Sequence, residues 1–321
     1  MSSDARESPD SAPYSPETVP STEEPCDRVA RSGRTSALHL PYPDLAGDRP
    51  SLGFVSRLIV ATTLPHSEPG DSEFTRHSGF YDLCLLAPRR VGLPYGRYPR
   101  LVLAWMITEA VKRQSPLLHP GSSLSSFATK IGITPSSGTK GTLLQLREQL
   151  HRLLNLTIVC LNSSVTDSSR FALPPAFRGG GVHLVKQFLL WWDNPSLTRD
   201  QPYILLSEDL CDELLAHPIP IDLEVVRSFR SPLEMDVYMW LTYRSIRTCR
   251  INRPESIPWE SLKRQFGSNY AEIRVFRFHF VRALKNVIKV YPAVRLRNTK
   301  EGLVLLPFPP HILPRARVFF S

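Results

Sequence analysis

The sequence predicts an α+β protein in which two tandem winged-helix domains follow a disordered N-terminal tail. Three observations predict this class. The first 50 residues are rich in Pro, Ser, Asp and Glu and have almost no apolar periodicity, so they bury too little surface to offset the entropy of ordering. The rest of the chain has apolar patterns of helical and strand period. These patterns twice follow the order helix, helix, helix, hairpin, which is typical of a winged helix.

Length and composition indicate how many domains the chain contains and where they begin and end. A chain of 321 residues, 42% of them apolar, is long enough for about two cores. We expect a tail at 1–50, an N-terminal winged helix at 51–222 and a basic C-terminal winged helix at 223–321. No apolar run reaches the roughly 20 residues of a membrane span, and the first residues are unlike a signal peptide. We therefore expect a cytoplasmic protein with no membrane partner.

The first domain opens with two expected strands, at 51–65 and 79–88. Residues 99–113 (PRLVLAWMITEAVKR) begin with a proline suited to a first helical turn and end in basic residues, which predicts a helix. Two shorter helices are expected at 123–133, closed by a glycine, and at 141–155, where leucines recur with helical spacing.

A hairpin and a connecting segment complete the first domain. The runs LTIVCLNSS at 156–164 and VHLVKQFLLWW at 182–192 are apolar and rich in branched or aromatic residues, which predicts two paired strands. A short strand and a helix follow at 203–218, with Ser207 as the expected N-cap. The prolines and the segment after them, at 218–228, are interpreted as the connection between the halves, because proline ends helices.

The second domain repeats the order. A long amphipathic helix is expected at 231–247, a short helix ended by a glycine at 257–267, and a third helix at 271–291. A hairpin of AVRLRN at 293–298 and GLVLLPF at 302–308 completes it.

Positive charge is concentrated in this second domain. Residues 225–321 hold 18 Lys and Arg but 6 Asp and Glu, whereas 51–224 hold 16 basic and 15 acidic residues, and the whole chain has a net charge of +9. A field built at one end of the molecule indicates a polyanionic partner that docks there.

The third helix of the second domain carries much of that charge. At about 100° per residue, one face collects apolar side chains: Ile273, Phe276, Phe280, Leu284 and Val287. Another face collects basic ones: Arg274, Arg282, Lys285 and Lys289. A helix that packs on a core and carries a basic stripe fits phosphate binding. The alternative is a solvated face, which also collects Lys and Arg.

A recognition helix lies in the major groove, with its early residues nearest the base edges. We therefore expect Arg274 and Arg277 to contact bases, since arginine can bridge guanine O6 and N7. The remaining basic residues are expected to contact phosphates, from the helix and from the hairpin: Arg282, Lys285, Lys289, Arg295 and Arg297. In the first domain, Lys140 precedes a helix whose free N–H groups can meet a phosphate, or it lies in a simple exposed turn. Arg152 is the other candidate there.

Catalytic patterns are missing from the sequence. No His-hydrophobe-His triplet of a nicking enzyme occurs, and GITPSSGTK at 132–140 lacks the spacing of a phosphate-binding loop. The five cysteines stand singly, without a CxxC pair for zinc. We expect a protein that is not an enzyme, with no catalytic residues, no metal and no cofactor.

Five stretches of the chain carry a resemblance. They are GLPYGRYPRLVLAWMITEAV at 92–111, LREQLHRLL at 146–154, LLSEDLCDELLAHPIPIDL at 205–223, and LEMDVYMWLTYR at 233–244 with IPWESLKRQFGSNY at 257–270. In these the chain resembles the plasmid-encoded RepA-type replication initiators.

The resemblance implies a protein that binds the double-stranded DNA of its plasmid's origin, helps to open it and recruits host replication proteins. It also implies repression of the protein's own gene and a part in plasmid copy control. By the same analogy, the C-terminal domain supplies most base readout, and the N-terminal domain serves for formation of a homodimer, for contacts to the DNA backbone, or for both.

Two other function classes remain open. A winged-helix transcriptional repressor without an initiation role has nearly the same sequence features, and differs by binding one palindromic operator. A protein-interaction module would use the basic helix on an acidic partner, and would bind DNA weakly and without salt dependence.

Overall fold

The computed structural model describes residues 51–77, 81–163, 181–193, 201–216, 218–267 and 270–312. The tail predicted at 1–50 lies outside these ranges. Within them the chain mixes helices and strands throughout, which confirms the α+β class. No described helix has both the length and the apolar character that a membrane span requires.

The first half of the described chain contains, in order, β1 (Leu52–Ser56), α2 (Arg57–Thr62), β2 (Glu73–His77), β3 (Tyr81–Leu86), α3 (Arg97–Arg113), β4 (Leu117–Leu118), α4 (Leu124–Lys130), α5 (Thr142–Leu154), β5 (Thr157–Ser163), β6 (Gly181–His183), β7 (Val185–Leu189), β8 (Tyr203–Leu206), α6 (Glu208–Ala216), β9 (Pro218–Asp222) and α7 (Leu223–Ser228). The second half contains α8 (Pro232–Ile251), β10 (Glu255–Pro258), α9 (Trp259–Phe266), α10 (Ile273–Val290), β11 (Leu296–Asn298) and β12 (Gly302–Leu305).

The strand predicted at 51–65 is wrong in its second part, which is the helix α2. Ser56 ends β1, and its hydroxyl accepts a hydrogen bond from the amide of Ile59. This side-chain cap stabilises the first turn of a helix, and it outweighs the β-branched residues that favour a strand. The helices predicted at 99–113, 123–133 and 141–155 are confirmed as α3, α4 and α5.

The hairpin predicted after α5 is confirmed only in its first part, because its second strand is divided. β6 pairs with β5, whereas β7 pairs with β8. Leu184 and Val185 are both buried, so the alternation of inward and outward side chains fails between them and the chain crosses from one sheet to the other. The result is two antiparallel sheets, one in the order β2-β3-β5-β6 and one in the order β4-β8-β7.

The segment 218–222, predicted as a connection, is the strand β9, which pairs antiparallel with β1. Prolines are tolerated there because β9 lies at the edge of a two-stranded sheet. Ser207 occupies the expected position before α6, where its hydroxyl accepts from the amide of Leu210 at 3.4 Å.

The second half has the predicted three helices and hairpin, α8, α9, α10 and β11-β12. One further strand, β10, joins the hairpin to give a sheet in the order β10-β12-β11. Its sequence is ESIP. A segment of four residues that contains Ser and Pro is too short and too rich in turn-forming residues to be recognised as a strand.

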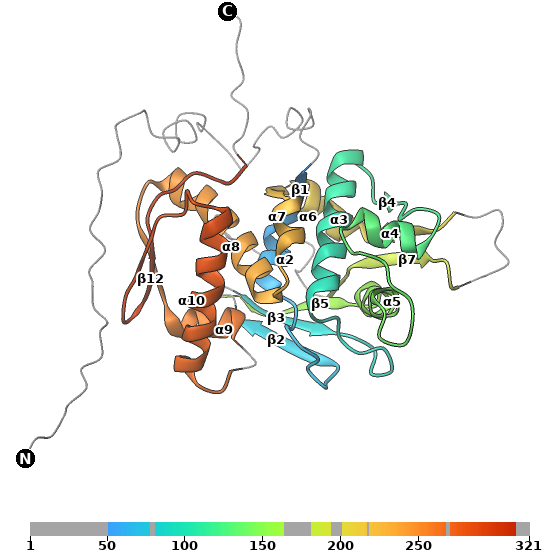
Figure 1. Cartoon of the computed structure of the whole chain (residues 1–321), viewed down its shortest axis with the longest axis horizontal. Helices are drawn as coiled ribbons and strands as arrows, with labels where there is room; N and C mark the ends of the chain where they lie inside the picture. The colour runs from blue at the N-terminus through green and yellow to red at the C-terminus, as the bar shows by residue number, and fades with distance from the viewer. Residues whose placement is uncertain are drawn as a thin grey trace, which may run out of the picture.

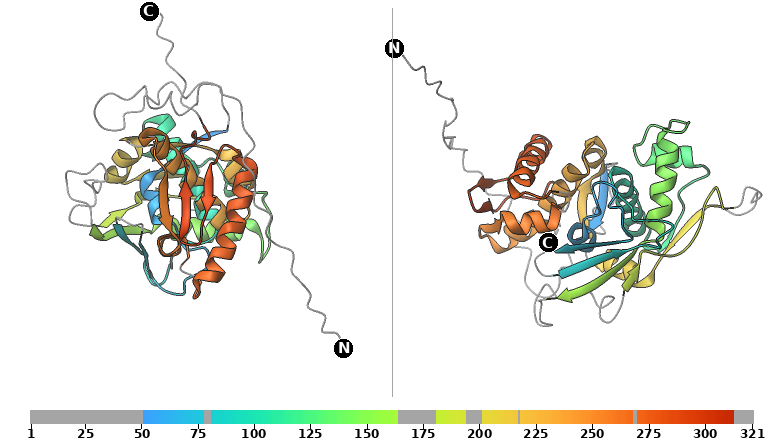
Figure 2. Two further views of the ribbon diagram at one scale, coloured as in Figure 1. Left: turned by 90° about the vertical axis from the view of Figure 1, so that its left-hand side faces the viewer. Right: turned by 90° about the horizontal axis from the view of Figure 1, so that it is seen from below.

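The two halves lie side by side (Figures 1 and 2). α8, α9 and α10 stand at one end beside the β11-β12 hairpin, and α4 and α5 stand at the other (Figure 1). A continuous core of buried side chains runs through both halves. Arg100 on α3 and Asp236 on α8 form an ion pair at 2.7 Å within it, with side chains only 2% and 3% exposed.

Candidate nucleic-acid interface

Helix α10 is held by an aromatic cluster beneath it. Phe280 lies at its centre, with ring centroids 5.4 Å from those of Phe266 and Phe276 and 6.1 Å from that of Trp259. Leu284 and Val287 continue the buried face. Four of the five residues predicted to share the apolar face are thus buried, and Ile273 is partly buried. The helical spacing therefore predicted the inward face of α10.

The opposite face of α10 carries four exposed basic residues, Arg274, Arg282, Lys285 and Lys289, which we call the basic face. Arg274, Arg282 and Lys285 form no hydrogen bond or ion pair with any residue that the structure describes. Lys289 donates to the side-chain oxygen of Asn286 at 3.3 Å. Unneutralised cations grouped on one helix face create a positive field that attracts phosphates.

Contacts on both sides of the basic face fix the orientation of α10 about its axis. Asn286 donates to the carboxylate of Glu234 on α8 at 2.7 Å. On the other side, the Arg277 guanidinium lies over the ring of Trp259, 5.0 Å from its centroid. Because these contacts and the buried apolar face hold α10 in place, the helix cannot rotate about its axis, and the basic face stays exposed.

Arg277 also holds the β11-β12 hairpin. Its guanidinium donates to the carbonyl oxygen of Thr299 at 3.1 Å and to the side-chain oxygen of Asn298 at 3.3 Å. This arrangement suits a residue that positions the hairpin. Base contact by Arg277 stays a prediction, and it requires these bonds to be exchanged for bonds to DNA.

The hairpin itself is anchored next to α10. The indole N–H of Trp259 donates to the carbonyl oxygen of Thr299 at 3.1 Å, and the amide of Thr299 donates to Gly302 at 2.9 Å. Arg295 and Arg297 are exposed on this hairpin, which lies beside α10 when the molecule is viewed from that end (Figure 2, left). The structure thus brings the predicted helix and hairpin residues to one end of the molecule.

The two candidates from the first half lie elsewhere. Lys140 is exposed just before α5, and α5 lies at the end of the molecule opposite α10 (Figure 1). Arg152 on α5 is paired at 2.8 Å with Glu68 and at 2.6 Å with Glu148. With two carboxylates and only 13% of its side chain exposed, Arg152 is poorly suited to bind a phosphate.

An exposed aromatic residue on the basic face was not predicted. Phe278 is 66% exposed, the most exposed large hydrophobic side chain among the described residues. The spacing contained the signal, because Phe276 and Phe280 lie one turn apart on the inward face and the residue between them must point the other way. Because aromatic residues stand at 276, 278 and 280, the segment suggests that all three side chains are buried, although only the first and the last are.

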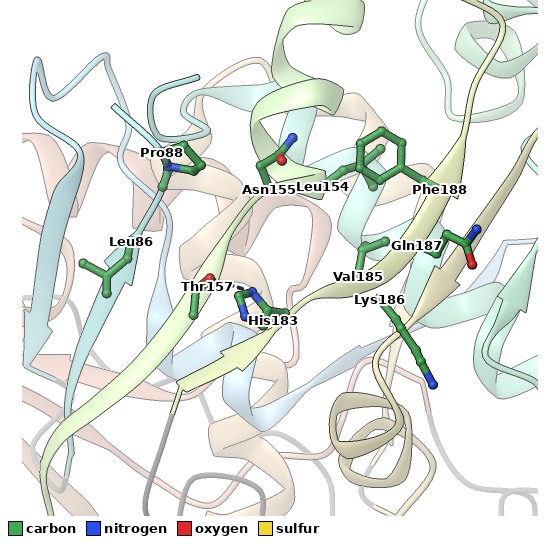
Figure 3. Close-up of a pocket in the computed structure, with 11 residues that line it drawn as sticks. Leu86, Pro88, Leu154, Asn155, Thr157, His183, Val185, Lys186, Gln187 and Phe188 are labelled. Atoms are coloured by element: carbon green, nitrogen blue, oxygen red, sulfur yellow. Dashed lines mark hydrogen bonds between the residues drawn. The ribbon is translucent and has the colours of Figure 1, made fainter. Parts of the chain in front are cut away.

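A separate hollow of about 480 Å³ lies in the first half, between the ends of β3, α5, β5 and the β6-β7 segment (Figure 3). Two of its polar groups satisfy each other, since Thr157 and His183 are hydrogen-bonded at 2.8 Å. Lys186 points away from the hollow (Figure 3) and pairs with Glu208 at 2.8 Å. The residues that line the hollow therefore present no converging charged groups of the kind that mark a catalytic or cofactor site.

Comparison with known proteins covers the middle of the chain. A protein-family model described as "Plasmid encoded RepA protein" matches residues 93–260. The match runs from just before α3 into the start of α9, so α10 and the β11-β12 hairpin lie beyond it. No curated protein matches the chain.

Two solved structures match this chain weakly. A crystal structure of RctB domains 2–3 has 13% sequence identity and a TM-score of 0.44, covering 77% of this chain and 94% of that one. A structure of selenomethionine derivatives of domains 2 and 3 of RctB has 12% identity and a TM-score of 0.44, covering 80% and 97%.

Proposed function

The chain belongs to the family of plasmid-encoded RepA proteins, the RepA-type replication initiators, and on this basis we propose that it binds the double-stranded DNA of its plasmid's origin sequence-specifically through α10. The observation that carries the proposal is the basic face of α10. Its cations are exposed, and three of the four are unpaired within the described chain, while the opposite side of the helix is buried in an aromatic cluster. A fixed helix with one basic side is suited to enter the major groove.

We propose that α8, β10, α9, α10 and the β11-β12 hairpin act as a winged helix, within a C-terminal domain at 223–321. Arg274 lies in the first turn of α10 and is the residue best placed to bridge guanine O6 and N7. The phosphate contacts come from Arg282, Lys285 and Lys289 along the helix, and from Arg295 and Arg297 on the wing. The anchoring of the hairpin by Trp259 and Arg277 supports this division.

The N-terminal part, at 51–222, has a different role in this proposal. It serves for homodimer formation or for contacts to the DNA backbone, with Lys140 as its exposed candidate. The protein then opens the origin, recruits host replication proteins and represses its own gene, and so takes part in plasmid copy control. It does this in the cytoplasm by binding alone, without catalytic groups.

The proposal is tested by footprinting the purified protein, at several salt concentrations, on the DNA that flanks its gene. An initiator protects several regularly spaced sites beside an AT-rich stretch, and its affinity falls steeply with salt. A single protected site over the promoter would instead favour a repressor. Absence of protection at low salt would contradict both functions.

A further inference from the structure

We infer that Phe278 is a specificity-determining residue that contacts the C5-methyl group of a thymine in the DNA site. The inference rests on the proposed function of α10 and goes beyond it, because it names one base and the side chain that reads it. The basis is the position of an exposed aromatic ring inside the basic face.

Phe278 lies one helical turn from Arg274 and one turn from Arg282. Residues four positions apart are neighbours on a helix surface, so the ring is flanked by a cation on each side along α10. All three side chains are exposed. Any polyanion that reaches both arginines must therefore cover the ring between them.

The ring is positioned by its neighbours. It meets the imidazole of His279 edge to face, with centroids 5.4 Å apart and planes at 85°. His279 in turn stacks on Tyr270, with centroids 5.1 Å apart and planes at 25°. Phe278 is thus 66% exposed while its ring is held by the contact with His279. Its side chain therefore loses little conformational freedom when it binds.

The chemistry of the major groove selects the base. Thymine presents a C5-methyl group there beside its O4 acceptor, whereas guanine, adenine and cytosine present hydrogen-bonding atoms and no methyl group. A phenyl ring has no donor or acceptor, and covering a polar base edge without a hydrogen bond is unfavourable. Contact with a methyl group removes apolar surface of both partners from water.

Replacement of single thymines by deoxyuridine removes only the methyl group and tests the inference. The probe is a synthetic duplex of the footprinted site, substituted at one thymine at a time, and the full chain is used. We expect the wild-type affinity to fall about fourfold at one position, the value for one buried methyl group. Phe278→Ala should bind the thymine duplex about that much more weakly, and should not distinguish the two duplexes at that position.

Controls separate contact from folding and from DNA shape. Leu144→Ala removes a side chain on α5 that is 48% exposed and should keep the wild-type response to deoxyuridine. Phe278→Leu keeps an apolar surface and should retain part of the response. Because Phe278 is exposed, its Ala variant should melt at the wild-type temperature.

The outcomes distinguish the inference from the proposed function. If wild type and Phe278→Ala respond equally to deoxyuridine, the methyl group acts through DNA shape and the inference is wrong. If wild type binds its site specifically but ignores every methyl group, only the inference is overturned. If wild type does not bind the duplex at all, the proposed function fails and the inference fails with it.

Discussion

Asp236 organises the buried contact between the two halves. Its carboxylate accepts from two nitrogens of Arg100, both at 2.7 Å, and lies 2.9 Å from the Nε2 atom of His66. Although burial alone would raise the pKa of Asp236, the Arg100 guanidinium and the His66 imidazole hold it below its usual value. The carboxylate is therefore ionised in the folded protein and neutralises a buried cation.

Asp236→Asn should destabilise the protein by about 3–5 kcal/mol, because it leaves the Arg100 charge buried without its counter-ion. Urea unfolding measures this difference. The matched control is Asp82→Asn, which breaks a pair with His77 whose side chains are 35% and 50% exposed and should cost less than about 1 kcal/mol. Equal losses in the two variants would contradict the assigned role of Asp236.

His66 should make stability depend on pH. Burial lowers the pKa of its imidazole below 6.5 despite the nearby Asp236, and the charges of Arg100 and Arg76 lower it further. Below pH 6.5 the unfolded chain then binds more protons than the folded protein, so stability falls as the pH decreases from 6.5.

His66→Gln should flatten this dependence in urea unfolding between pH 7.5 and roughly pH 5. A smaller slope should remain from His311, whose pKa burial also lowers. An unchanged slope in the variant would show that His66 titrates alike in the folded and unfolded states.

At the scale of the element, α10 offers a matched pair of phenylalanines. Phe280→Ala should destabilise the protein by about 3–5 kcal/mol, because it empties the centre of the aromatic cluster. Phe278→Ala, two residues away and on the exposed face, should change stability by less than about 0.5 kcal/mol. Chemical denaturation measures both. A large loss in Phe278→Ala would mean that α10 is rotated from its described orientation.

Long periodic elements were predictable from the sequence, and elements made by distant pairing were not. The leucines of α5 and the faces of α10 repeat with helical spacing, so their inward sides follow from local pattern. β9 is a strand because β1 lies beside it, and β10 because β12 does, and neither partner is visible in the local sequence. α2 depends on a single capping hydroxyl.

The same distinction applies to the candidate interface. The basic face of α10 was predicted, since it needs only the helical repeat. The partners of the other arginines come from remote segments: Arg277 binds the turn at Thr299, and Arg152 binds Glu68. Hydrogen bonds and ion pairs of this kind depend on tertiary packing, so a count of basic residues overstates how many are unpaired on the surface.

The whole molecule carries its charge asymmetrically. α10 and the hairpin lie at one end, while α5 lies at the other (Figure 1). Residues 225–321 hold three times as many basic as acidic residues, whereas 51–224 are nearly balanced. In the proposed function, this field attracts DNA to α10 at one end of the protein and leaves the other half for a further contact.

The salt dependence of binding by Arg274→Ala/Lys285→Ala on the footprinted duplex tests DNA binding through α10 most directly. The control, Arg89→Ala/Lys112→Ala, removes the same charge from exposed positions in the first half. We predict that the α10 variant loses affinity about 5- to 150-fold through its base contact, and that its salt slope decreases by about one unit, while the control binds nearly as wild type. Equal affinity and slope in the α10 variant and wild type would contradict binding through α10.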